Sequence, residues 1–226
     1  MRFIYKDLLN FLTEQPSKEA LSKKLFQLGH EHNIDGDIFD MEITPNRGDC
    51  LSLFGLSRDL NNFYNCKDDF EIYGEEIEIL DLNFKNLSVD SCPKISFLEI
   101  EIDGKISSYK PYLENYFSKL GNNKTNFFTD ISNYISYERG QPTHCFDRES
   151  LGDDLIFSNN PCQDSFKTLL GHEIKLEDQN CVFISNEEII SLAGIMGGDS
   201  TACSVKTKKV LIECAYFNPE AIIGKT

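Results

Sequence analysis

The chain has 226 residues, of which 40% are hydrophobic and 26% charged, enough for one large domain or two small ones with cores of their own. Its 22 Lys and Arg residues face 37 Asp and Glu residues, and the resulting net charge of −15 argues against non-specific nucleic-acid binding. No apolar run approaches a membrane span and residues 1–6 lack the apolar block of a signal peptide, so we expect a cytoplasmic protein without a membrane partner.

The first strong pattern is a helix that Ser17 is suited to cap and that Gly29 is suited to end. The apolar residues that give it one buried face are Leu21, Leu25 and Leu28. His30 and His32 follow two residues apart, which on a strand would place them on one face. Because the sequence offers no third ligand near them, it does not predict a metal site there.

Residues 38–43 alternate between apolar and polar side chains, which predicts a half-buried strand. The polar turn 44–49 follows, and Asp49 is expected to cap a second helix. That helix would bury Leu53, Leu56, Leu60 and Phe63. We interpret the turn as a strand-to-helix connector, with anion binding by Arg47 at the helix start as the alternative.

The stretch 65–92 is acidic and has no clear period, so we interpret it as a linker with at most one edge strand at 76–80. The predicted domains are therefore 1–80 and 92–226. The predicted fold class is α+β, with a small N-terminal α+β domain followed by a larger mixed α/β domain.

The second domain is expected to open with a strand at 95–102, followed by a helix from Pro111 to Leu120. A second helix is predicted over 126–139, and Gly140 would end it. Pro142 stiffens the turn that follows, so this turn should present His144 in one direction. Asn133 lies 11 residues before His144, and we expect the two side chains to converge on one pocket.

Further strands are predicted at 155–157, 181–184 and 189–192. The loop 193–199 contains three glycines but lacks the Lys-Ser/Thr pair of a P-loop and the spacing of a dinucleotide fingerprint. We expect its glycines to let the backbone approach a ligand closely.

The last predicted strand, 209–215, is strongly apolar except for Glu213. A carboxylate buried in such a strand needs a partner or a raised pKa, whereas the alternative is an edge position facing water. Asn218 and Pro219 then begin a helix, and the chain stops within its first turns, which suggests a fragment.

Cysteine usage favours free thiols. None of the eight cysteines forms a Cys-x-x-Cys pair, and their spacings are irregular. The sequence therefore predicts neither a metal site nor a disulfide.

These motifs together resemble the N-terminal part of the bacterial-type phenylalanyl-tRNA synthetase beta subunit. The matching segments occur in the family's order and span nearly the whole chain: 42–52, 131–134, 140–147, 193–199 and 210–219. The resemblance implies that residues 1–80 are the small first domain of that subunit. It also implies that residues 92–226 are the editing domain, which hydrolyses tyrosine mischarged onto the phenylalanine tRNA.

By the same resemblance, His144 matches the catalytic histidine of the editing site and Glu213 the carboxylate that recognises the tyrosine hydroxyl. The other substrate-binding positions that it implies are Ser132, Asn133, Ala193, Gly194 and Gly197. Ser132 stands where the family usually has threonine, which keeps the hydroxyl.

The chain departs from the family in several places. An arginine that often precedes the pocket helix aligns with Asn123, and only residues 34–37 stand where an oligonucleotide-binding domain is usually inserted. A Thr-Asp-Ala-Ser segment of the pocket wall and the domain that docks on the alpha subunit would both follow residue 226. We therefore expect an editing domain that is incomplete at its C-terminus and hydrolyses weakly or not at all.

The resemblance implies no cofactor in this part of the enzyme, although the whole synthetase would use ATP and Mg. The implied partners are the 3′ end of tRNA(Phe) and the alpha subunit, in an assembly of two alpha and two beta subunits. Two alternatives remain: a non-catalytic docking piece of the synthetase, and a stand-alone editing protein that acts in trans.

Overall fold

The structure, a computed structural model, describes residues 1–66, 74, 76–104 and 108–224. The chain folds into two compact units, each built from several segments. The first unit comprises the described residues within Met1–Glu76, Ile106–Lys124 and Asn133–Pro142. The second comprises those within Ile77–Lys105, Thr125–Ser132 and Thr143–Thr226.

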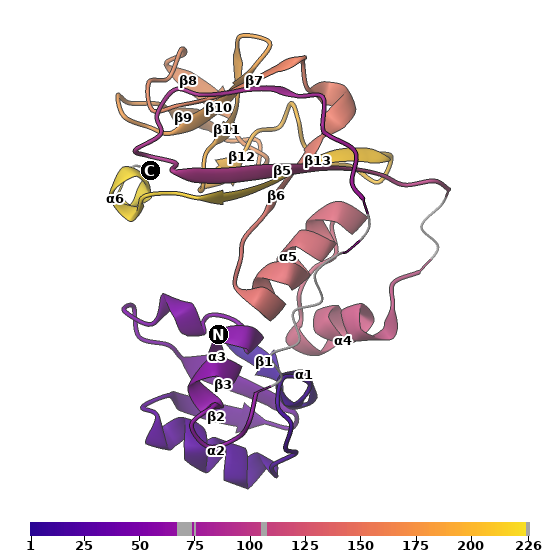
Figure 1. The fold of residues 1–226 in the computed structure, drawn as a ribbon, viewed down its shortest axis with the longest axis vertical. Coiled ribbons are helices and arrows are strands. Elements are labelled where there is room, and N and C mark those ends of the chain that lie inside the picture. The colour runs from indigo at the N-terminus through magenta and orange to yellow at the C-terminus, as the bar shows by residue number, and fades with distance from the viewer. Residues whose placement is uncertain (67–73, 75, 105–107, 225–226) are drawn as a thin grey trace. The chain divides into compact units, whose positions relative to one another are not determined.

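The first unit contains a three-stranded antiparallel sheet in the order β1-β3-β2 (Figure 1). Its strands are β1 (Arg2–Ile4), β2 (Glu31–Asp35) and β3 (Ile38–Glu42). The helices of this part of the chain are α1 (Tyr5–Leu9), α2 (Lys18–Gln27), the 3-10 helix η1 (Gly48–Cys50) and α3 (Leu53–Leu60). The alternation predicted at 38–43 is confirmed, because Phe39 and Met41 are buried while their neighbours are not.

Capping residues explain where the helices begin. Ser17 caps α2, as predicted, by accepting a hydrogen bond from the backbone nitrogen of Ala20 at 3.3 Å. The expectation that Asp49 caps the next helix is wrong. Ser52 caps α3 instead, accepting from the backbone nitrogen of Gly55 at 3.0 Å, and the Asp49 carboxylate is engaged by arginine side chains.

The second unit is built from a five-stranded sheet in the order β12-β11-β10-β7-β4, a three-stranded sheet in the order β5-β13-β6, and the pair β8-β9. Strands of the five-stranded sheet are β4 (Asn83–Asn86), β7 (Asp154–Ser158), β10 (Val182–Ser185), β11 (Glu188–Leu192) and β12 (Met196–Gly197). The others are β5 (Lys94–Glu101), β6 (His144–Asp147), β13 (Lys209–Tyr216), β8 (Ser165–Lys167) and β9 (Glu173–Lys175). Figure 1 shows β5 and β13 side by side.

Apolar side chains from both larger sheets form the main core of the second unit. Phe146 and Leu211 of the three-stranded sheet belong to the same buried cluster as Phe157 and Phe183 of the five-stranded sheet. Each of these four side chains is fully buried. At about 25 cal/mol per Å² of apolar surface removed from water, this cluster is a main source of stability for the unit.

Three further helices are α4 (Pro111–Leu120), α5 (Phe127–Arg139) and α6 (Pro219–Ile222), with the 3-10 helix η2 at Arg148–Ser150. Gly140 follows α5 with φ of 81°, as the predicted left-handed cap requires. The C-terminal part of α5 belongs to the first unit, where the Tyr137 hydroxyl accepts from the backbone nitrogen of Ile4 at 3.2 Å and donates to Asp7 at 3.2 Å. The predicted domain 92–226 thus differs from the observed second unit, which excludes α4 and this part of α5.

The predicted α+β class is confirmed. Residues 76–80 form no strand, which the prediction of at most one strand in this linker allowed, and Ile79 is 98% exposed. The strand lies later, at β4, which pairs in parallel with β7. His144, the residue that the predicted turn was expected to present, is the first residue of β6 and pairs with β13. The charged residues 67–69 of the predicted linker, one lysine and two aspartates, lie outside the described residues.

None of the helices within the part of the chain that the structure describes combines enough length with enough apolar character to span a lipid bilayer.

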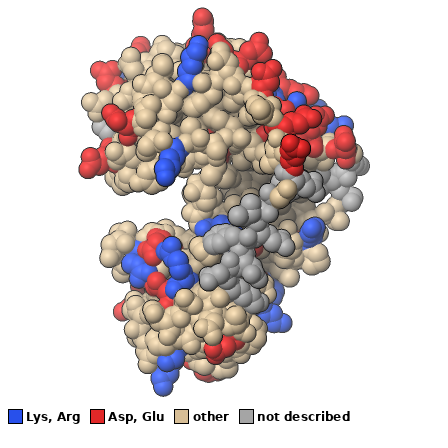
Figure 2. All heavy atoms as spheres, in the orientation of Figure 1, with Lys and Arg blue, Asp and Glu red and all other residues tan. Residues whose placement is uncertain are grey.

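Acidic side chains gather along one side of the second unit, where β5 ends (Figures 1 and 2). This side would repel a phosphate backbone rather than attract it.

Gly55 provides a direct test of how α3 packs. An added Cβ would lie 1.8 Å from the backbone oxygen of Asp49, whereas at Gly48 it would meet nothing within 4 Å. Gly55→Ala is expected to lower the free energy of unfolding by about 1–3 kcal/mol or more through this clash. The matched change Gly48→Ala should stay within about 0.5 kcal/mol of the natural chain. Urea unfolding measures both, and equal stabilities would contradict the packing.

Candidate functional site

His144 and Glu213 are brought together by the pairing of β6 with β13, in which they are direct cross-strand partners. Cross-strand partners project their side chains from the same face of a sheet. The next pair on that face is Phe146 and Leu211, which both belong to the buried cluster between the sheets. The carboxyl and the imidazole therefore face the apolar interior of the second unit.

Glu213 is a buried carboxyl, only 6% exposed. Within the described residues, its side-chain carboxyl has no hydrogen bond and no ion pair. Burial raises its pKa to about 7, because removing the charged form from water is costly. The alternative of an edge position facing water is wrong, since β13 is the central strand of its sheet.

His144 is held in its neutral form. Burial lowers its pKa to about 4, so the imidazole carries no charge near pH 7. Its ring meets the ring of Phe146 edge-on, with 4.4 Å between the centroids. A Cβ at Gly197 would lie 2.5 Å from Cε1 and 3.0 Å from Nε2 of His144, so only glycine lets β12 approach the imidazole this closely.

The glycines of the predicted loop make room for aromatic side chains of this same chain. Gly194 has φ of 72°, and an added Cβ would lie 3.0 Å from the ring of Phe217. Ala193 is buried and donates its backbone N–H to the carbonyl of Cys181 at 2.8 Å. In this structure the space above Gly194 and Gly197 is therefore filled by Phe217 and His144.

Ser132 and Asn133 fall on different units. Ser132 is buried in the second unit and donates its hydroxyl to the carbonyl of Thr143 at 2.7 Å, which positions the residue before His144. Asn133 is exposed in the first unit, where it lines a cavity of about 480 Å³ with Asn122 and other residues of that unit. That Asn133 shares one cavity with His144 stays a prediction.

Three cysteines near Glu213 were not recognised from the sequence as part of this site. Burial raises the pKa of Cys92 and of Cys145 to about 11, and the charge of Glu213 adds to both shifts. Burial also raises the pKa of Cys214, next to Glu213 in β13. All three are therefore protonated thiols near pH 7, and none is a ready nucleophile or metal ligand.

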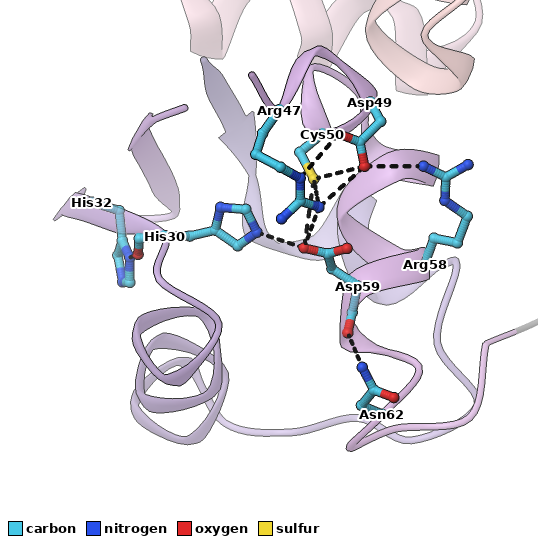
Figure 3. A network of polar contacts seen from close by, with 8 residues as sticks. All are labelled: His30, His32, Arg47, Asp49, Cys50, Arg58, Asp59 and Asn62. Atoms are coloured by element: carbon cyan, nitrogen blue, oxygen red, sulfur yellow. Dashed lines mark hydrogen bonds and ion pairs between the residues drawn. The ribbon is translucent and has the colours of Figure 1, made fainter. Parts of the chain in front are cut away.

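A second polar cluster lies in the first unit, where Arg47 reaches several partners at once (Figure 3). Its Nη2 donates to Oδ2 of Asp59 at 2.7 Å and to Sγ of Cys50 at 2.8 Å, and its Nε donates to Oδ1 of Asp49 at 3.0 Å. The hydrogen bond from Arg47 is the main cause that lowers the pKa of Asp49 to about 2. Burial raises the pKa of Asp59, but hydrogen bonds from Arg47 and His30 outweigh it and leave that pKa below its usual value.

The same cluster contains metal-ligand side chains that the sequence did not connect. One ligand atom each from His30, Cys50 and Asp59 lie within 4.8 Å of one another. The Arg47 guanidinium already supplies a cation to Asp59 and Cys50, and burial raises the pKa of the Cys50 thiol to about 12. A metal would have to displace Arg47 and deprotonate Cys50, so these residues fit a charge-balanced network better than a metal centre.

Comparison with known proteins gives a family match and a set of relatives. Residues 98–226, more than half of the chain, match the family described as the B3/4 domain. The phenylalanine–tRNA ligase beta subunit of Fusobacterium nucleatum is 31% identical over 194 residues, covering 84% of this chain and 24% of the relative. That of Carboxydothermus hydrogenoformans is 31% identical over 221 residues, covering 92% and 26%.

The chain thus spans about a quarter of the length of the curated relatives that it matches. Among solved structures, an N-terminal fragment of the phenylalanyl-tRNA synthetase beta subunit from Pyrococcus horikoshii is similar with a TM-score of 0.48 and 13% identity. The similarity covers 98% of this chain and 69% of that one.

The buried carboxyl predicts an unusual dependence of stability on pH. The pKa of Glu213 is raised from 4.5 to about 7 on folding, so the folded chain binds more protons and stability falls as pH rises between these values. Glu213→Gln should lack this fall, which for a shift of this size is on the order of 3 kcal/mol. The variant should therefore gain stability relative to the natural chain between pH 5 and pH 8, as thermal or urea unfolding can measure.

His144 has the opposite effect on stability, because its lowered pKa makes stability fall as pH drops from about 6.5 to about 4.

The control for Glu213→Gln is Glu101→Gln, at an exposed position of β5, which should leave the dependence of stability on pH unchanged. A constant difference between Glu213→Gln and the natural chain from pH 5 to pH 8 would contradict the burial of an ionisable, unpaired carboxyl.

Proposed function

This chain belongs to the B3/4 domain family, and on that premise we propose that its second unit is a post-transfer editing site. It hydrolyses tyrosine mischarged onto tRNA(Phe), as part of a bacterial-type phenylalanine–tRNA ligase beta subunit. The observation that carries the proposal is Glu213, a desolvated carboxyl with no partner among the described residues, opposite the neutral imidazole of His144.

Selection of tyrosine follows from Glu213. The phenol of tyrosine donates a hydrogen bond to the carboxylate, whereas phenylalanine leaves this buried acceptor unpaired. An unpaired buried acceptor costs about 1–3 kcal/mol, which corresponds to a discrimination of about fivefold to 150-fold. Such a site rejects the cognate amino acid and is the second sieve of a double-sieve scheme.

The role of His144 follows from its charge. A general base is most effective when its pKa lies near the working pH, and the pKa of His144 is about 4. The neutral imidazole still offers one donor and one acceptor nitrogen. His144 therefore acts mainly by orienting the attacking water or the terminal ribose, rather than by removing a proton in full.

The wider assembly is part of the same proposal, of which the names of the relatives support only the phenylalanine–tRNA ligase beta subunit itself. The partners would be the 3′ end of tRNA(Phe) and an alpha subunit, in a cytoplasmic ligase of two alpha and two beta subunits that uses ATP and Mg elsewhere. Since the net charge of this chain is −15, most of the tRNA backbone would be held by other parts of that enzyme.

A second candidate is a docking role without hydrolysis. The observation that favours it is the filled space above the glycine loop, where His144 lies against Gly197 and Phe217 against Gly194. An editing site would need these rings to move when a substrate enters. A docking piece would keep them in place.

Binding of free amino acids separates the two candidates. The editing proposal predicts that tyrosine binds at least about fivefold more tightly than phenylalanine, and that Glu213→Ala abolishes this preference. Titration calorimetry measures both affinities. Glu101→Ala, which removes an exposed carboxylate from the same sheet, is the matched control and should keep the preference.

His144→Ala should slow still further the hydrolysis of tyrosyl-tRNA(Phe), which we expect to be weak in this chain, but keep tyrosine binding, because it removes a positioning group rather than the phenol acceptor. Equal affinity for the two amino acids in the natural chain would refute the editing site and favour the docking role. A preference that survives in Glu213→Ala would refute the assignment of Glu213.

A further inference from the structure

A serine and a histidine of the first unit form a close pair that the proposed function does not use. Ser22 lies on α2 and His32 on β2, and the Ser22 hydroxyl oxygen is 2.8 Å from Nε2 of His32. The other ring nitrogen, Nδ1, is 2.9 Å from the backbone carbonyl oxygen of His30. A carbonyl only accepts, so Nδ1 carries the proton and, in the neutral ring, Nε2 accepts the proton of Ser22.

Neighbouring rings hold the imidazole in this orientation. The centroid of the His32 ring lies 5.4 Å from that of Phe39 and 5.9 Å from that of Phe26. The imidazole is thus supported by two aromatic contacts and one backbone hydrogen bond. A nucleophile within hydrogen-bond reach of a base, with the base oriented by a third group, is the arrangement that activates a hydroxyl for attack.

The hydroxyl lies beside a groove that could receive a substrate. Ser22 is one of the residues that line a concave surface of about 630 Å³; the others are Lys18, Glu19, Lys23, Phe26, Gln27 and Ile34. Phe26 is 61% exposed and Ile34 43% exposed, so the groove offers apolar side chains to solvent. All of these residues belong to the first unit.

We propose that Ser22 and His32 form a nucleophilic dyad that accepts esters of small apolar acyl groups. The Ser22 oxygen attacks the ester carbonyl while its proton passes to Nε2 of His32. The bond to the leaving alcohol then breaks, and His32 returns the proton to that alcohol. Water releases the acyl group from Ser22 in a second step, again with His32 as base, and regenerates the hydroxyl.

The groove supplies complementary groups for such a substrate. Phe26 and Ile34 form the apolar surface for the acyl chain. Lys18 is engaged with Asp37 at 2.5 Å and with the carbonyl of Gly36 at 2.8 Å. Lys23, the other lysine that lines the groove, is the ammonium that the proposal assigns to the developing oxyanion.

A purely structural role for the Ser22–His32 hydrogen bond would tie α2 to β2 without making Ser22 reactive. Covalent labelling distinguishes the two roles. An alkyl fluorophosphonate forms a bond from phosphorus to the Ser22 oxygen, loses fluoride and leaves the proton on His32. Intact mass and peptide mapping then show which serine has reacted.

Ser118 on α4 is an internal control, because this exposed helical serine donates its hydroxyl to the carbonyl of Glu114 at 2.8 Å and has no hydrogen bond to a histidine among the described residues. The proposal predicts that Ser22 is labelled about a hundredfold faster than Ser118, the range expected for a positioned base. p-Nitrophenyl butyrate should likewise give an acyl adduct at Ser22.

Two variants test the dyad itself. His32→Phe keeps a ring between Phe26 and Phe39 but removes the base, and His32→Gln keeps a polar side chain; circular dichroism checks that each is folded. Labelling of Ser22 should fall to the rate of Ser118 in both. No faster labelling of Ser22 than of Ser118 in the natural chain, or an unchanged rate in a folded His32 variant, would overturn the proposal.

Discussion

A carboxyl and an imidazole lie opposite each other where β13 pairs with β6, and both face an apolar interior. Neither can keep its usual charge there at low cost, because the charged forms are poorly solvated away from water. The protein accommodates Glu213 by raising its pKa to about 7 and His144 by lowering its pKa to about 4. Burying two ionisable side chains lowers the stability of the fold. The apolar core around them, with Phe146 and Leu211 beside the pair, offsets this cost.

The same arrangement connects structure to function. Glu213 changes its charge near neutral pH, so its strength as a hydrogen-bond acceptor depends on pH in the physiological range. His144 stays neutral over that range and can position water. Gly197 allows β12 to lie against the imidazole, which any larger residue would prevent. The pairing of β6 with β13, the glycine at 197 and the shifted pKa values of Glu213 and His144 therefore all act at the same place in the fold.

The helix ends could largely be predicted from local sequence patterns. The partners of the buried and charged side chains could not, because they depend on contacts between distant segments. Ser17 and Gly140 mark helix ends through hydrogen bonds and backbone angles of their own, so the sequence predicts them well. Asp49 satisfies the same local sequence criteria for a helix cap. Its carboxylate instead accepts hydrogen bonds from the side chains of Arg47 and Arg58. No local pattern reveals that Glu213 is a central rather than an edge residue, or that His30 meets Asp59 across 29 positions.

The most direct test of this account is the ionisation of the two side chains themselves. Carbon-13 NMR can follow the side-chain carboxyl of Glu213 and the ring of His144 through a pH titration of the natural chain. The account predicts that Glu213 titrates near pH 7 and His144 near pH 4. Titration of Glu213 near 4.5 and of His144 near 6.5, their ordinary values, would contradict it.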